Sequence, residues 1–270
     1  MAKKQIISEN EFRNVFSRRG FIATIVTGLL ATQIPLKAVG SGKGSRSNSV
    51  KKAILFDGFV IFNPAPVFAL AAELFGSQST ELVALWRTKQ FEYSWILTAA
   101  KQYKDFWRVT EDALTFAAAK IGLAMTDENK ARLMNVYLNL DIWPDVVAGL
   151  ETLKKMNISL SFLSNFTVDM LKSSLKKNNI SQYFDHLLST DEVRAFKPSP
   201  AAYQMGIDTL KLPKDDIVFA AFGAWDACGA KFFGFPTFWV NRGDSTPEEL
   251  GVSADVVGRE LPELIAYMKK

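Results

Sequence analysis

The sequence holds one cysteine, Cys228, and one histidine, His186. A single cysteine excludes an intrachain disulfide and a metal site built from several cysteines. A single histidine without a serine or cysteine partner at a nucleophile elbow leaves little scope for histidine-based catalysis. We therefore interpret Cys228 as a small core residue and His186 as a structural or surface residue, and we expect the chemistry to come from carboxylates.

The part of the chain after residue 50 also lacks an excess of charge. Residues 1–50 carry eight Lys and Arg against two acids, whereas the remaining residues carry 24 against 26. The remaining part has no run rich in Lys and Arg, which argues against nucleic acid as a partner. With 270 residues, 48% of them hydrophobic, the chain can bury the core of one large domain, or of a domain with an insertion.

The first fifty residues have the features of a targeting signal. Two adjacent arginines in SRRGFIA (17–23) open a weakly hydrophobic run of roughly 16 residues, shorter than the about 20 of a membrane span. This pattern resembles a bacterial twin-arginine export signal. We expect a signal over residues 1–40, a flexible linker over 41–51, and the twin-arginine export machinery as a partner. The protein would be periplasmic or exported, or tethered to the membrane if the signal stays uncleaved.

From residue 52 onward, apolar strands alternate with helices around one long helical stretch. This alternation predicts an α/β fold, a doubly wound and mostly parallel sheet with a Rossmann-like core. We assign residues 52–65 and 142–270 to the core domain, and residues 66–141 to an inserted helical cap of four or five helices.

Polar residues stand at or just past the carboxyl ends of the predicted strands. Asp57 follows AILF (53–56), Ser164 and Asn165 follow the next core strand, and Asp226 follows IVFAA (217–221). Ligands bind at this edge of open α/β sheets, so the sequence predicts a site there.

Six stretches around these positions carry a family resemblance. They are ILFD (54–57), LWRTKQFEYSW (85–95), FWRVTEDAL (106–114), LSNF (163–166), FKPSPAAY (196–203) and AWDACGAKFFGFPTFWVNR (224–242). In this order and spacing they resemble the type II (L-2-haloacid) dehalogenases of the haloacid dehalogenase superfamily, over nearly all of residues 52–269. The resemblance implies an inserted cap and hydrolytic removal of halide from small 2-haloacids.

The resemblance also implies catalytic roles for four side chains. Asp57 would displace halide from the substrate's α-carbon and form an ester, and Lys197 would neutralise the carboxylates and keep both ionised. Asp226 would orient or activate the hydrolytic water, and Arg87 would accept the halide. Each also has an ordinary interpretation: Asp57 as a turn cap, Arg87 as a surface residue, and Lys197 as part of a Lys-Pro turn.

The remaining predicted residues would bind a small organic anion as substrate. The resemblance assigns the substrate carboxylate to Ser164 and Asn165, and support of Lys197 or substrate to Tyr203. It assigns an apolar pocket wall, which could equally be plain core, to Phe59, Phe91, Phe106 and Trp225. Phe59 stands where superfamily phosphatases carry a second Asp for Mg²⁺, and an aromatic ring cannot ligate a hard cation. We therefore expect no metal and no cofactor, and a homodimer is the assembly common among relatives.

Several positions depart from the family pattern. Val60 and Ile61 replace Gly-Thr, Ala221 and Gly223 replace Ser and Asn, and Phe166 replaces a Gly, with Phe222 between Ala221 and Gly223. Three positioning polar groups are thus missing, and loss of one such group typically lowers a rate by about 10²–10³. The apolar changes could suit a bulkier substrate or could fill the pocket. The alternative to an active enzyme is a degenerate member that binds a small organic anion, or a hydrolase with an altered substrate.

Overall fold

The computed structural model describes residues 51–269, to which all structural statements refer. The predicted export signal (1–40) and nearly all of the predicted linker (41–51) lie outside these residues. No helix within 51–269 combines the length and hydropathy needed to cross a membrane.

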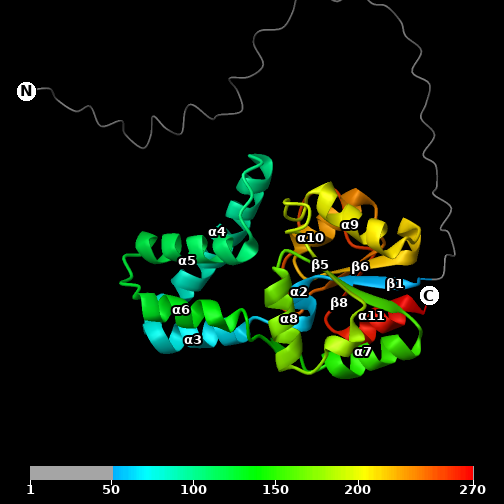
Figure 1. The fold of residues 1–270 in the computed structure, drawn as a ribbon, viewed down its shortest axis with the longest axis horizontal. Coiled ribbons are helices and arrows are strands. Elements are labelled where there is room, and N and C mark those ends of the chain that lie inside the picture. Colours follow the sequence, from blue (N-terminus) through cyan, green and yellow to red (C-terminus); the bar gives the residue numbers. More distant parts are fainter. Residues whose placement is uncertain (1–50, 270) are drawn as a thin grey trace, which may run out of the picture. The chain divides into compact units, whose positions relative to one another are not determined.

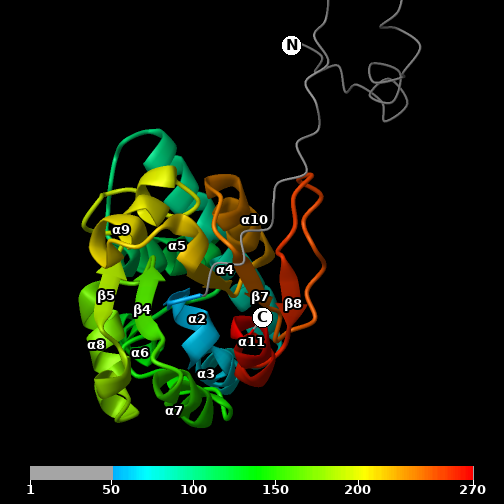
Figure 2. The same ribbon diagram turned by 90° about the vertical axis from the view of Figure 1, so that its right-hand side faces the viewer.

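A six-stranded parallel sheet forms the core, in the order β5-β4-β1-β6-β7-β8. Figure 2 shows β5 and β8 at its opposite ends. The strands are β1 (Ala53–Phe56), β4 (Ser159–Ser164), β5 (His186–Ser189), β6 (Ile217–Ala221), β7 (Thr237–Val240) and β8 (Val256–Gly258). All residues of β1, β6 and β7 are buried, as expected of parallel strands covered on both faces. The predicted fold class is confirmed.

Helices cover both faces of this sheet, and the alternation of β1 side chains explains which helix lies where. Ile54 and Phe56 point into one apolar cluster with α7, α8 and α11, whereas Ala53 and Leu55 point into a second cluster with α9 and α10. Figure 1 shows these two groups on opposite sides of the strands. Their bounds are α7 (Val146–Lys155), α8 (Val168–Lys177), α9 (Pro200–Leu210), α10 (Ala224–Phe233) and α11 (Leu261–Met268).

Between β1 and α7 the chain forms a group of four helices beside the sheet (Figure 1). They are α3 (Ala65–Phe75), α4 (Ser79–Ala99), α5 (Phe106–Lys120) and α6 (Asp127–Val136). The chain enters this group along β2 (Phe62–Asn63) and leaves it along β3 (Asp141–Ile142), which pair antiparallel. Their number agrees with the four or five helices predicted, while β2, β3, β8 and α11 were not predicted. The domain boundaries stay a prediction.

Candidate active site

Asp57 lies where β1 ends and caps the short helix α2 (Gly58–Ile61). Its Oδ1 accepts a hydrogen bond from the amide of Phe59 at 2.9 Å, and its own amide donates to the carbonyl of Ala220 on the adjacent strand at 3.0 Å. The predicted cap interpretation of Asp57 is thus correct as a matter of geometry. The side chain nevertheless keeps 13% of its surface exposed and borders a pocket, so capping does not remove it from chemistry.

Lys197 is fully buried and joins two carboxylates. Its Nζ lies 2.7 Å from Oδ2 of Asp57 and 2.6 Å from Oδ2 of Asp226. Burial acts to lower the pKa of Lys197, but the two carboxylates outweigh burial, and the pKa ends above its ordinary value. The lysine is therefore a permanent cation under the pocket.

Asp226, at the start of α10, is subject to the predicted effect of Lys197, which favours the ionised carboxylate, and to an opposing effect of burial. Burial raises the pKa of Asp226 to about 6, and Asp57 adds to this rise, although Lys197 opposes it. Both carboxylate oxygens are bonded, Oδ2 to Lys197 and Oδ1 to the hydroxyl of Tyr203 at 2.7 Å. The side chain is 1% exposed, so almost none of its surface is open to solvent.

Tyr203, predicted to support Lys197 or the substrate, lies behind the pocket instead. It is completely buried, and its hydroxyl donates to Asp226 rather than facing a ligand. Gly229 makes this contact feasible, because a Cβ there would meet the Tyr203 hydroxyl at 2.4 Å. A tyrosine placed to orient a carboxylate differs from one that touches substrate. We call Asp57, Lys197, Asp226 and Tyr203 the floor of the pocket.

Ser164 and Asn165, at the end of β4, line the pocket. Asn165 also holds the backbone of Lys197, a residue of the floor. Ser164 Oγ accepts from the amide of Phe166 at 3.1 Å, which leaves its hydroxyl hydrogen to donate. Asn165 Oδ1 accepts from the amide of Lys197 at 3.0 Å and so fixes the lysine loop. Gly58 leaves room for the Ser164 hydroxyl, because a Cβ at residue 58 would lie 3.0 Å from Ser164 Oγ.

The helical insertion also holds the lysine loop. Thr98, near the end of α4, accepts from the amide of Phe196 at 3.0 Å, and the hydroxyl of Tyr103 donates to Asp191. The Tyr103 ring packs 5.0 Å from the ring of Phe196. Loop and insertion therefore position Lys197 together.

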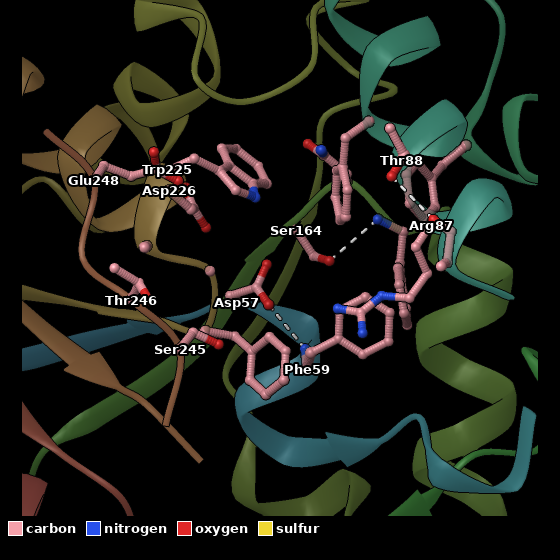
Figure 3. Close-up of a pocket in the computed structure, with 18 residues that line it drawn as sticks. Asp57, Phe59, Arg87, Thr88, Ser164, Trp225, Asp226, Ser245, Thr246 and Glu248 are labelled. Atoms are coloured by element: carbon pink, nitrogen blue, oxygen red, sulfur yellow. Dashed lines mark hydrogen bonds between the residues drawn. The ribbon is translucent and has the colours of Figure 1, made fainter. Parts of the chain in front are cut away.

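Above the floor lies a cavity of about 410 Å³ between the sheet edge and α4. Six aromatic side chains line it, and we call them, with Arg87, the wall: Phe59, Phe91, Phe106, Phe166, Phe222 and Trp225. Phe59, Arg87 and Trp225 are labelled around Asp57 in Figure 3. Size and composition are those of a small-molecule site, mostly apolar with a few polar groups.

Arg87 brings the wall its positive charge. It projects from α4, is exposed, and lies 5.5 Å from the centre of the Phe68 ring. Within residues 51–269 it makes no ion pair, unlike Arg108 and Arg132 on the neighbouring helices. An unpaired guanidinium at a pocket beside a carboxylate can receive an anion.

The positions that depart from the family pattern divide into two groups. Ile61 and Ala221 are fully buried and take no part in lining the cavity. Phe166, Phe222 and Gly223 do line it. Ile61 and Ala221 therefore make the surroundings of the site more apolar without bordering the cavity, whereas Phe166 and Phe222 make the cavity lining itself more apolar.

The loop after β7 adds three pocket residues that sequence reasoning missed: Ser245, Thr246 and Glu248. Asn241 fixes this loop, because its Nδ2 donates to the carbonyl of Ser245 at 2.9 Å and its Oδ1 accepts from the amide of Ser245 at 2.7 Å. Figure 3 shows all three on the side of Asp226 and Trp225. Their position past the carboxyl end of a core strand was the available signal.

The arrangement suits attack by a carboxylate on an electrophile in an apolar pocket. Asp57 is held by one amide and one ammonium, is poorly hydrated, and faces a guanidinium across the cavity, as nucleophilic displacement with an anionic leaving group requires. Within residues 51–269, no group of three or more His, Cys, Asp and Glu side chains is placed to hold a metal ion.

The sequence and the structure are both similar to those of known proteins. Residues 59–234 match the family model described as haloacid dehalogenase-like hydrolase. The (S)-2-haloacid dehalogenase 2 of Pseudomonas sp. (strain CBS-3) is 39% identical over 198 residues, which are 73% of this chain and 86% of that protein. The crystal structure of the L-2-haloacid dehalogenase RSc1362 has a TM-score of 0.80 at 36% identity, covering 82% of this chain and all of that one. The L-2-haloacid dehalogenase of Xanthobacter autotrophicus with covalently bound chloropropionic acid has a TM-score of 0.74 at 27% identity, covering 81% of this chain and 98% of that one.

Proposed function

The chain belongs to the haloacid dehalogenase-like hydrolases, and we propose that it removes halide from small 2-haloacids through an ester on Asp57. The similarity to proteins named (S)-2-haloacid dehalogenase supports this proposal. The observation that carries it is the floor, where Lys197 bridges Asp57 and Asp226 at 2.7 and 2.6 Å beneath an aromatic-lined cavity.

In the first step a lone pair on an Asp57 carboxylate oxygen forms a bond to the α-carbon of the substrate. The carbon–halogen bond breaks, and halide leaves with the electron pair. Arg87 receives the halide, and Ser164 and the backbone beside Asn165 hold the substrate carboxylate. The attacking oxygen is poorly hydrated in the apolar pocket, which increases its nucleophilicity.

In the second step water attacks the carbonyl carbon of the Asp57 ester. The bond between that carbon and the ester oxygen breaks, and the 2-hydroxy acid leaves with an oxygen that came from Asp57. One proton of the water goes to the product hydroxyl and the other to solvent, with Asp226 orienting or activating the water. Lys197 stabilises the negative charge as the Asp57 carboxylate is restored.

The test is incubation with racemic 2-chloropropionate in ¹⁸O-water, followed by mass spectrometry of the peptide that contains Asp57. Repeated turnover should place ¹⁸O in the Asp57 carboxylate and release chloride. The variant Asp57→Asn, which keeps the size of the side chain, should release none while unfolding at a similar temperature. Chloride release by Asp57→Asn, or release by the native protein without label, would refute the ester.

A second function, binding of a small organic anion without turnover, is favoured by one observation. Asp226 is 1% exposed with both oxygens bonded, and no side chain at Ala221 or Gly223 can position a water. Such a protein would form the Asp57 ester once, or not at all. A single equivalent of chloride per protein, with a stable mass increase on Asp57, would identify this case.

We also propose that residues 1–40 carry an export signal for the twin-arginine machinery, and that the protein works in the periplasm or beyond. The support is the pair Arg18 and Arg19 before a weakly hydrophobic run. Replacing both arginines by lysine should retain the full chain in the cytoplasm of a bacterial host, measured by cell fractionation. If the protein with both lysines still reaches the periplasm, the proposed twin-arginine signal is wrong.

A homodimer through the inserted helices is a further part of this proposal. The large apolar side chains Trp95 and Ile96 of α4 and Phe116 of α5 are 40%, 53% and 37% exposed. Large apolar side chains exposed on two packed helices are of the kind that an interface between two copies would cover. Light scattering should give a mass near twice 30.1 kDa for the full chain, and Ile96→Glu should reduce it; a monomeric native protein would contradict the dimer.

A further inference from the structure

The cavity wall indicates which kind of substrate binds, a point that the proposed dehalogenation does not specify. The inference below rests on that proposed function and concerns the group attached to the α-carbon. The cavity holds two kinds of surface: polar side chains beside Asp57, on α4 and on the loop after β7, and the six aromatic rings of the wall. A haloacid with a methyl substituent engages the polar groups but leaves most of the rings uncovered.

The rings of the wall do not fill the cavity. Phe166 and Phe222 pack against Phe59, with ring centres 5.0 and 5.6 Å from it, and Phe106 stacks on Phe166 at 5.6 Å. Each ring is thus held by its neighbours, and a cavity of about 410 Å³ remains in front of them. Of the two alternatives that the sequence left open, a bulkier substrate and a filled pocket, the packing favours the first.

Gly223 determines the position of the ring on the α10 side. A Cβ at residue 223 would lie 2.7 Å from Nε1 of Trp225, so a side chain there would displace the indole. In its observed position the indole contacts two rings of α4, Phe91 at 5.2 Å and Trp95 at 5.5 Å. The replacement that removes a polar side chain from the cavity lining therefore also completes an aromatic surface on the wall.

We propose that the preferred substrates are 2-haloacids whose α-carbon carries an apolar substituent of about the size of a benzyl group. The carboxylate and halide stay with Ser164 and Arg87, and the substituent covers the rings of Phe59, Phe222 and Trp225. Burying a side chain of the size of phenylalanine favours binding by roughly ten- to a hundredfold over leaving it in water. Contacts between offset or edge-on rings add to this preference.

The experiment compares kcat/KM for racemic 2-chloro-3-phenylpropionate and 2-chloropropionate, measured as chloride release by the full chain. We expect the ratio to favour the phenyl substrate by about tenfold or more. Phe222→Ala should reduce this ratio several-fold, because it removes one ring of the wall. The matched control Phe232→Ala changes a phenylalanine on α10 that is 62% exposed and does not line the cavity, and it should leave the ratio unchanged.

The ratio is measured on one sample, so it does not depend on how much of a variant is folded. A preference for 2-chloropropionate would overturn the inference and leave the proposed function intact. Absence of chloride release from both substrates would instead refute the proposed function. In that case calorimetry on Asp57→Asn with 3-phenylpropionate and propionate still tests the wall: tighter binding of the phenyl acid supports the inference, and equal or weaker binding overturns it.

Discussion

The floor and the wall of the pocket differ in how their side chains are bonded and exposed. In the floor, the side chains of Asp57, Lys197, Asp226 and Tyr203 bond to one another and are almost fully buried. In the wall, Arg87 is exposed and makes no ion pair within residues 51–269, and most of the rings present a surface to the cavity. Groups bonded to each other have a fixed geometry before any ligand arrives, whereas a guanidinium without an ion-pair partner and ring faces that border the cavity are available to a ligand. The floor is therefore suited to chemistry and the wall to selection.

The largest effect should come from removing the central charge of the floor. Lys197→Met leaves two buried carboxylates without their cation, which should lower the free energy of unfolding by about 3–5 kcal/mol. Chloride release should fall by at least about a hundredfold. Denaturant unfolding and a halide assay measure the two effects. Lys120→Met, at an exposed lysine in the last turn of α5, is the control. If the Lys197→Met protein were stable and active, the floor would not depend on its central charge, and the distinction between floor and wall would be wrong.

Arg87→Ala tests the wall and should affect activity without affecting stability. Because the guanidinium is exposed and unpaired in the described part of the chain, its loss should change the free energy of unfolding by less than about 0.5 kcal/mol. Loss of a positioned donor to the leaving group should lower kcat/KM for 2-chloropropionate by about 10²-fold. Arg108→Ala, at a 63% exposed arginine of α5, is the matched control. Large destabilisation by Arg87→Ala would show that Arg87 is structural.

The smallest effect should come from the tyrosine behind the floor, and it should depend on pH. In the proposed mechanism the ionised form of Asp226 assists hydrolysis, so activity should rise as pH increases through about 6. Tyr203→Phe removes a donor that stabilises the ionised form, so the pKa of Asp226 and the midpoint of the profile should move upward. At pH 6 the rate should fall by several-fold up to about tenfold, with recovery at pH 8. A midpoint that stays in place or moves down would contradict this role.

The sheet and the helices were predictable because their signals are local. Fully apolar runs such as those of β1 and β6 predict buried parallel strands, and the helical stretch over residues 66–141 predicted the group α3–α6. The short strands β2, β3 and β8 were missed because pairs or triplets of residues carry no periodicity. Their partners are chosen by tertiary packing.

The sequence predicted which residues form the candidate site better than it predicted how they are arranged. Positions at strand ends brought Asp57, Ser164 and Asp226 together, as expected. The sequence did not reveal that burial would raise the pKa of Asp226, since the pKa depends on depth and partners that only the fold determines. Nor did it reveal that Tyr203 lies behind Asp226, or that the β7–β8 loop reaches the cavity, because contacts of this kind depend on how segments pack.

The pairing of β2 with β3 has a consequence for how such a protein can change over time. The inserted helices leave and rejoin the core through two neighbouring strands of two residues each, so the ends of the insertion stay together whatever its length. Mutations that lengthen, shorten or reshape α3–α6 need not rethread the central sheet. Natural variation can thus remodel the part of the wall that the insertion supplies, Arg87, Phe91 and Phe106, while the reacting carboxylate keeps its place.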